Sequence, residues 1–255
     1  MMKKQYIVGE NNMAETTIDD FLGGLIRLKQ PKRGYRATSD AVMVSAAVEP
    51  KFGDTVLDVG CGSGIVGLCV GARVSIQLTS VEIQSELAEL ARFNGEINGQ
   101  KITVIEGDVS QKIPQLHGIQ FHHVVTNPPF YTETPTRQSK QIEMAYKQIV
   151  PLDKWIDFCL RHLRANGTFT IIHRAEAVPE ILSLLKGRLG AIRLIPIFPK
   201  KGVKPKRVII QGVMNSKKPF EIHTGFVMHH FDDTRTEAAE CIMRKGLSLS
   251  EVQNL

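Results

Sequence analysis

Between residues 55 and 173, short runs of β-branched and other apolar residues alternate with segments in which apolar positions recur at helical spacing. Runs of the first kind predict five strands, at residues 55–60, 77–83, 101–108, 122–127 and 168–173. The helical patterns occupy residues 65–73, 85–98 and 153–167, and the last is expected to end at the Asn166-Gly167 C-cap signal. Strands that alternate with helices favour right-handed βαβ units, so we expect a mostly parallel sheet covered on both faces.

The pattern changes after Gly190, where two strand-like runs follow each other without a helical segment between them. Residues 191–199 and 207–215 are joined by a turn rich in Lys, Gly and Pro, which predicts an antiparallel hairpin. Residues 221–231 are consistent with a further strand and residues 234–246 with a last short helix. The expected organisation is a single domain, 1–255, with a lead-in at 1–37, a core at about 38–215 and a C-terminal extension at 216–255.

The composition is that of an ordinary globular protein, with 42% hydrophobic and 23% charged residues. The net charge of +6 is compatible with a polyanionic partner, although many basic proteins bind none. Neither the four scattered cysteines nor the eight histidines have metal-ligand spacing, so we expect reduced thiols, no disulfide and no metal. The N-terminus lacks an apolar leader and no run approaches membrane-spanning length, so we expect a cytoplasmic protein without a membrane partner.

The segment TVLDVGCGSGIVG joins the first predicted strand to the first predicted helix through three glycines. Gly60, Gly62 and Gly64 can adopt positive φ and let a ligand approach the backbone closely, because they lack a Cβ. Gly62, Gly64 and Gly67 also form the pattern G-x-G-x-x-G, which alone would suggest a dinucleotide such as NAD.

Three carboxylates at successive strand ends favour a different ligand. Asp58 ends the first strand, where it would repel a pyrophosphate and attract a cation. Glu82 ends the second strand, where it can accept hydrogen bonds from ribose hydroxyls, and Asp108 ends the third, where it can accept from an adenine amino group. The alternative is that all three only cap turns and helices. A ligand with adenine, ribose and positive charge but no phosphate matches S-adenosylmethionine.

The motifs VLDVGCGSG, VEI, EGD and NPPF, in this order, resemble those of the class I S-adenosylmethionine-dependent methyltransferases that methylate amino groups. The resemblance extends from about residue 37 to residue 215. It implies an α/β, Rossmann-like fold with a seven-stranded, mostly parallel sheet and a C-terminal antiparallel hairpin. It also implies that S-adenosylmethionine is the cofactor and that the segment NPPF holds the amine.

An exocyclic amine on a base is a weak nucleophile, because its lone pair is delocalised into the ring. The resemblance implies that the Asn127 side-chain oxygen and the Pro128 carbonyl accept hydrogen bonds from the amine and direct its lone pair toward the methyl group. Pro129 would stiffen this segment, Phe130 would stack on the base for about 1–3 kcal/mol, and Tyr131 would line the pocket and contact RNA. The amine loses its proton after transfer, so positioning and electrostatics would supply most of the catalysis.

Two further stretches, GGLIRLKQPKRGYRATSDAV and FPKKGVKPKRVII, resemble the bacterial tRNA adenine-N6 methyltransferases that modify the adenine 3′ to the anticodon of valine tRNA. Residues 38–40 carry the N-cap signal of a helix that packs on the sheet, and we also expect the loop 34–38, ending at Thr38, to cover the cofactor, which Asn127 would contact as well. The resemblance implies that the partner is the tRNA anticodon stem-loop, without an obligate protein partner. Candidate phosphate contacts are Lys32, Arg33, Arg36, Lys200, Lys201, Lys204 and Lys206. For residues 200–207 the alternative is a solvated hairpin that protects a sheet edge.

Other functions stay open, because enzymes with different acceptors share NPPF. They include guanine-N2 methylation of ribosomal RNA and glutamine methylation of protein, and a protein substrate would predict little salt dependence. A non-catalytic RNA-binding protein with a degenerate methyltransferase fold is disfavoured by the intact residues Asp58, Gly60, Gly62, Glu82 and Asn127. An NAD-dependent dehydrogenase is disfavoured by Asp58 together with NPPF.

Overall fold

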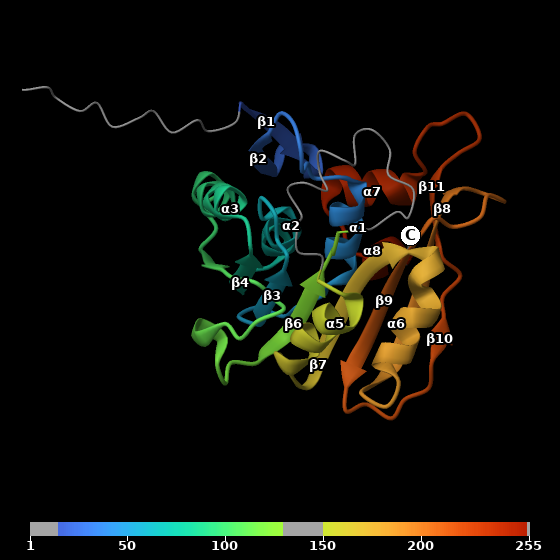
Figure 1. Ribbon diagram of the computed structural model, residues 1–255. Helices are drawn as coiled ribbons and strands as arrows, with labels where there is room; N and C mark the ends of the chain where they lie inside the picture. The colour runs from blue at the N-terminus through green and yellow to red at the C-terminus, as the bar shows by residue number, and fades with distance from the viewer. Residues whose placement is uncertain (1–14, 130–149, 254–255) are drawn as a thin grey trace, which may run out of the picture.

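The computed structural model describes residues 15–129 and 150–253, which are arranged around one large sheet (Figure 1). The strands are β1 (Thr16–Phe21), β2 (Ile26–Pro31), β3 (Thr55–Val59), β4 (Gln77–Glu82), β5 (Ile102–Glu106), β6 (Phe121–Thr126), β7 (Leu163–Arg174), β8 (Leu189–Lys200), β9 (Arg207–Met214), β10 (Glu221–Ile222) and β11 (Phe226–His229). The α-helices are α1 (Ser39–Ala47), α2 (Ile65–Arg73), α3 (Ser85–Ile97), α5 (Leu152–Arg161), α6 (Val178–Leu185), α7 (Glu237–Lys245) and α8 (Leu249–Gln253). In these two stretches, none of the helices has the length and apolar character needed to cross a bilayer.

The sheet has nine strands in the order β10-β8-β9-β7-β6-β3-β4-β5, with β11 also paired to β8. Strands from β7 to β5 are parallel to their neighbours, whereas β9 is antiparallel to both β7 and β8. The five predicted strands and the predicted hairpin are therefore confirmed. The expected number of seven strands is too low, because β10 and β11 extend the hairpin edge as two separate short strands. The sequence indicates one further strand within residues 221–231, but strands of two and four residues are too short for the pattern to show that the segment is divided.

Alternating apolar residues divide the core into two layers, one on each face of the sheet. In β3, Val56 packs in the cluster that contains residues of α1, α2, α7 and α8, while the next residue, Leu57, packs in the cluster that contains residues of α5 and α6. Figure 1 shows α5 and α6 on the face of the sheet nearer the viewer. Helices thus cover both faces, as βαβ units require, and the ends of the strands are left for a ligand.

One predicted helix boundary is wrong for a local reason. Helix α5 ends at Arg161, and β7 begins at Leu163, so the Asn166-Gly167 signal does not cap the helix. Asn166 has φ 59°, and it lies where the register between β6 and β7 shifts. The same preference of Asn for left-handed φ therefore serves an irregularity in a strand instead of a helix end.

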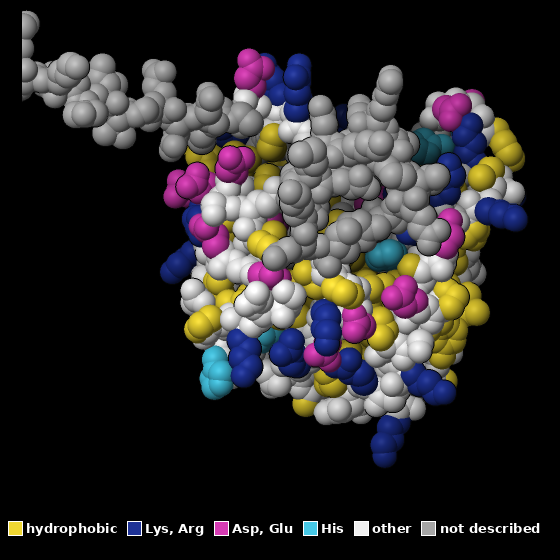
Figure 2. Space-filling model, in the orientation of Figure 1, with side chains coloured by type: hydrophobic (Ala, Val, Ile, Leu, Met, Phe, Trp, Pro, Cys, Tyr) yellow, Lys and Arg dark blue, Asp and Glu magenta, His cyan; other side chains and the backbone are white. Residues whose placement is uncertain are grey.

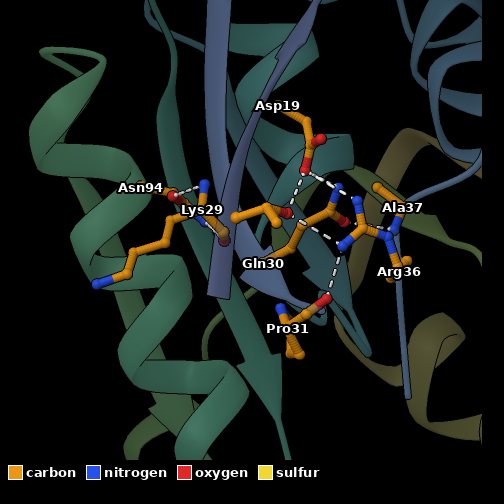
Figure 3. Close-up of polar contacts among 8 residues, drawn as sticks. Asp19, Lys29, Gln30, Pro31, Arg36, Ala37 and Asn94 are labelled. Carbon is orange, nitrogen blue, oxygen red and sulfur yellow. Dashed lines mark hydrogen bonds and ion pairs between the residues drawn. The ribbon is translucent and has the colours of Figure 1, made fainter. Parts of the chain in front are cut away.

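Residues 16–31, expected to be part of a lead-in, form the separate hairpin β1–β2. The buried Asn94 of α3 fixes this hairpin: its side chain accepts from Lys29 N at 2.7 Å and donates to Lys29 O at 2.8 Å (Figure 3). Asn94 also donates to the carbonyl of Ser63, at 2.9 Å, within the glycine loop. The hairpin is therefore tied to the loop that the sequence marks as a ligand site.

Candidate active site

A cavity of about 360 Å³ lies at the carboxyl ends of β3, β4, β5 and β6. The strand order reverses here, because β4 and β6 lie on opposite sides of β3. Such a reversal opens a crevice in which α/β proteins bind ligands. The lining residues are Gly34, Tyr35, Arg36, Thr38, Asp40, Gly60, Gly62, Val81, Glu82, Ile83, Gln84, Leu87, Gly107, Asp108, Val109, Asn127, Pro128, Pro129, Val150, Trp155 and Arg207.

The glycine loop is held against β4 by its own backbone. Gly60 N donates to Val81 O at 2.9 Å, and Gly62 N donates to Glu82 Oε2 at 2.8 Å. Both glycines have positive φ, of 71° and 56°. A Cβ at Gly60 would come within 2.7 Å of the Trp155 ring, and one at Gly62 would overlap the Tyr35 ring. These two positions therefore require glycine for conformation and for space.

The sequence also predicts that Gly64 contacts the cofactor, but this glycine does not line the cavity. It precedes α2 with φ 90°, and a Cβ there would lie 3.3 Å from the Cβ of Ala91 in α3. Its small size lets α2 and α3 approach each other, so its role is in packing.

Asp58 likewise does not line the cavity; it is 1% exposed and supports the loop from within the protein. Its Oδ2 accepts from Gly67 N at 3.0 Å, whereas Oδ1 has no hydrogen-bond partner among the described residues. Burial raises the pKa of Asp58 to about 7; the hydrogen bond from Gly67 opposes this shift and the nearby Glu82 carboxylate adds to it. A positive charge in the cavity would favour the ionised form.

Glu82 and Asp108 do line the cavity, as the sequence predicts. Glu82 is 5% exposed, and its oxygens accept from Gly62 N and Gln84 N at 2.8 and 2.9 Å. Burial raises the pKa of Glu82, and these backbone hydrogen bonds oppose the shift. Asp108 Oδ1 accepts from Ser110 N at 2.8 Å, which fixes its orientation. A carboxylate offers about four acceptor positions, so both groups retain capacity for ligand hydroxyl or amino groups.

Asn127, Pro128 and Pro129 also line the cavity, directly after β6. The buried Thr126 anchors this segment: its Oγ1 donates to Val59 O at 2.8 Å and accepts from Trp155 Nε1 at 2.9 Å. The prolines also line a second cavity of about 410 Å³, which reaches the ends of β7 and α6. Predicted site residues Phe130 and Tyr131 lie outside the described residues.

The loop after β2 covers the cavity from the side of the β1–β2 hairpin. Arg36 donates to Pro31 O at 2.7 Å, Thr17 Oγ1 at 3.1 Å and Asp19 Oδ2 at 2.9 Å (Figure 3). Gln30 also donates to Asp19, at 2.9 Å, and accepts from Ala37 N at 2.9 Å.

The guanidinium of Arg36 is thus engaged with the β1–β2 hairpin, although its side chain is still 36% exposed, and its role in binding RNA stays a prediction. The other cations of this segment are more exposed: Lys32 forms only a surface pair with Glu15 at 3.1 Å. Thr38 lines the cavity and precedes α1, but its side chain makes no cap hydrogen bond.

Sequence patterns do not reveal three contributors to the cavity wall. Trp155 belongs to the amphipathic pattern of α5, and Asp40 and Arg207 are far apart in the sequence. In the structure Arg207 Nε pairs with Asp40 Oδ2 at 2.7 Å at the cavity wall. Within residues 15–129 and 150–253, no group of three His, Cys, Asp or Glu side chains could hold a metal ion.

Comparisons with known proteins point to one reaction class. The family described as "Methyltransferase small domain" matches residues 38–195. A curated protein named tRNA1(Val) (adenine(37)-N6)-methyltransferase, from Bacteroides fragilis, is 23% identical over 208 residues, which cover 79% of this chain and 88% of that protein. A protein of the same name from Phocaeicola vulgatus is 26% identical over 176 residues, covering 68% and 74%.

Solved structures establish the fold. A predicted O-methyltransferase from Agrobacterium tumefaciens superposes with a TM-score of 0.67 at 22% identity and covers 82% of this chain and 97% of its own. A protein from Listeria monocytogenes, assigned to the class I S-adenosylmethionine-dependent methyltransferases, superposes with a TM-score of 0.55 at 14% identity, covering 78% and 68%. The Rossmann-like class I methyltransferase fold inferred from the motifs is confirmed.

Proposed function

This chain belongs to the methyltransferase small domain family, and from that premise we propose that it methylates N6 of an adenine in tRNA, the adenine 3′ to the anticodon of valine tRNA. Its family and fold make it an S-adenosylmethionine-dependent methyltransferase. The observation that carries the choice of an amine is that Asn127, Pro128 and Pro129 line the same cavity as the glycine loop, Glu82 and Asp108.

The residues of the cavity fit S-adenosylmethionine. Gly60 and Gly62 bring the loop backbone to the cavity wall, and the buried carboxylates of Asp58 and Glu82 favour a cationic ligand over one with phosphates. When bound, the cofactor supplies a methyl group on a positively charged sulfur. We assign Glu82 to the ribose hydroxyls and Asp108 to the adenine amino group, because both acceptors line the cavity at successive strand ends.

Asn127 and Pro128 would then act on the acceptor amine. The side-chain oxygen of Asn127 and the carbonyl of Pro128 accept the two amine hydrogens, which turns the nitrogen lone pair toward the methyl group. The hydrogen bonds of Thr126 to Val59 and Trp155 fix the start of this segment. The second cavity, which the two prolines also line, would give the base its approach. The amine proton leaves after transfer, so the site needs no strong base.

An RNA substrate is supported by the names of the relatives and by the cations at the carboxyl edge of the sheet. A target adenine must be unstacked to reach the site, and an anticodon loop offers such bases. A tRNA substrate also implies that the enzyme acts in the cytoplasm.

Transfer of labelled methyl groups to tRNA, ribosomal RNA and protein, assayed in parallel and followed by nucleoside and amino-acid analysis, tests the proposal. We expect N6-methyladenosine in tRNA. Label in guanine N2 of ribosomal RNA or in glutamine would instead assign one of the alternative acceptors. No transfer to any acceptor would support the non-catalytic RNA-binding protein.

Replacement of Asn127 tests the acceptor role directly. Asn127→Ala should reduce kcat on the order of 100-fold or more, because one of two preorganised groups is lost, while calorimetry should show cofactor affinity near that of the wild type. Asn127→Asp keeps an acceptor oxygen and should retain part of the activity. A kcat of Asn127→Ala close to that of the wild type would refute the acceptor role of Asn127.

A further inference from the structure

The loop between β11 and α7, residues 230–235, presents an aromatic ring to solvent. Phe231 is 76% exposed. The loop is nevertheless held by its own hydrogen bonds: His230 N donates to Thr234 O at 2.8 Å, and Thr234 N donates to Asp232 Oδ1 at 3.0 Å. The ring is therefore displayed from a fixed backbone, and a partner that covered it would gain its hydrophobic burial.

Lys200, the last residue of β8, joins this loop to the β8–β9 turn. Its Nζ donates to Phe231 O at 3.2 Å and pairs with Asp233 Oδ1 at 2.7 Å. These contacts hold the backbone at Phe231 beside the start of the β8–β9 turn. They also occupy the ammonium of Lys200, so its predicted contact with a phosphate gives way to a positioning role.

The three remaining lysines of the turn, Lys201, Lys204 and Lys206, are exposed. None of them forms an ion pair within the described part of the chain, whereas their neighbours Lys200 and Arg207 do. Figure 2 shows Lys and Arg side chains gathered at the upper right, where Figure 1 places the ends of β8 and β11. Exposed cations without carboxylate partners attract phosphates.

Sheet topology places these two loops beside the candidate active site. Arg207, which lines the cavity, is paired with Ile197 of β8, and Lys200 lies three residues further along that strand. Three residues of a strand span about 10 Å. His229 of β11 is paired with Lys200, so Phe231, two residues later in the chain, lies just beyond Lys200 along the strand direction. The separation from Arg207 to Lys200 corresponds to about three stacked nucleotides at 3.4 Å each.

We propose that Phe231 is a stacking platform for an unpaired base of the RNA substrate, a few nucleotides from the methylated adenine, whose phosphates lie over Lys201, Lys204 and Lys206. The inference rests on the RNA substrate proposed above. A single-stranded loop fits this surface, because every base offers a π-face to an aromatic ring while its backbone follows the cations. A protein partner would favour a contiguous apolar patch, whereas Phe231 is flanked in the chain by the polar residues His230 and Asp232.

Binding of a labelled anticodon stem-loop RNA, measured by fluorescence anisotropy, tests the stacking role. Phe231→Ala should weaken binding about 5- to 150-fold, while Phe231→Trp should bind like the wild type. The matched control is Phe52→Ala: Phe52 is 83% exposed but precedes β3, at the amino ends of the parallel strands, so its loss should not change binding. Equal losses for the Phe231→Ala and Phe52→Ala variants would overturn the proposal.

Abasic substitutions separate stacking from a structural effect. In an RNA that lacks the base stacked on Phe231, the Phe231→Ala substitution should weaken binding no further. In RNAs that lack a base at another position, Phe231→Ala should weaken binding by the full factor. In turnover assays Phe231→Ala should raise KM without lowering kcat, because stacking outside the reacting centre stabilises ground and transition states equally. If Phe231→Ala weakened binding by the same factor whichever base was removed, stacking would be refuted.

Salt dependence distinguishes the ring from the lysines. Lys204→Ala and Lys206→Ala should each flatten the slope of log K against log salt concentration by about 0.7, whereas Phe231→Ala should leave the slope unchanged. Self-association that Phe231→Ala abolishes, with RNA affinity unaltered, would make this surface a protein interface and overturn the proposal. Equal KM values for tRNA in the wild type and Phe231→Ala would refute this inference alone. Absence of RNA methylation by the wild type would refute the proposed function.

Discussion

Replacing Asp58 with Asn removes a titration that lies near neutral pH while keeping the size of the side chain. Asp58 is 1% exposed, and burial raises its pKa to about 7 from an ordinary value of 3.8. The amide of the Asp58→Asn variant retains an oxygen that can accept from Gly67 N, the bond that Asp58 makes at 3.0 Å. The substitution therefore changes the charge of this position and preserves its main contact.

The magnitude follows from the difference between the folded and unfolded pKa of Asp58. An acid whose pKa is raised by folding stabilises the fold fully below its unfolded pKa, and this stabilisation is lost as the pH rises through the folded pKa. With values of 3.8 and about 7, the contribution of Asp58 to the free energy of unfolding falls by about 2–3 kcal/mol between pH 5 and pH 8. The neutral amide of the Asp58→Asn variant has no such dependence.

Urea unfolding of both proteins between pH 5 and pH 8 measures this effect. The free energy of unfolding of the wild type minus that of Asp58→Asn should fall by the stated amount as the pH rises. Other titrations largely cancel in the difference: burial lowers the pKa of His173 to about 4, for example, and this group is present in both proteins. Parallel pH profiles for the two proteins would refute the proposed electrostatics of Asp58.

Two further substitutions test the loops around the cavity. Gly62→Ala should weaken cofactor binding by at least about tenfold, because the added Cβ would overlap Tyr35. The control is Gly99→Ala, where φ is a similar 64° but nothing lies within 4 Å, and its cofactor affinity measured by calorimetry should be unchanged. Equal cofactor affinities for the two variants would contradict the close contact between Gly62 and Tyr35. Arg36→Gln should lower the free energy of unfolding by only about 1 kcal/mol, because its pair with Asp19 is partly exposed. It should also raise the cofactor dissociation constant by loosening the loop, and an unchanged constant would argue against that role.

The glycine loop and its neighbouring carboxylates could be predicted because each is a local pattern at the end of a strand. Parallel strands bring their carboxyl ends to one edge, so Glu82 and Asp108 had to lie near Gly60 and Gly62 once the strand order was of the doubly wound kind. The same patterns could not distinguish a residue that faces the cavity from one that supports it. Asp58 is directed into the protein by its bond to Gly67, and no spacing rule reveals this.

Contacts between distant segments explain the rest of what the sequence could not show. Tyr35 lies over Gly62 only because the loop before α1 is clamped by Arg36 to the β1–β2 hairpin. Arg207 meets Asp40 because β9 runs antiparallel to β7, which returns its first residue to the edge where the parallel strands end. The contact between Arg207 and Asp40 therefore depends on the order of the strands at the antiparallel side of the sheet.

Opposite charges occupy neighbouring parts of this edge without cancelling each other. The carboxylates of Asp58 and Glu82 are buried beside the glycine loop, so water screens them poorly and their field acts on the cavity. The pair of Asp40 with Arg207 is locally neutral and lies between that cavity and the lysine turn. The cationic cofactor and the polyanionic RNA of the proposed function would therefore bind side by side.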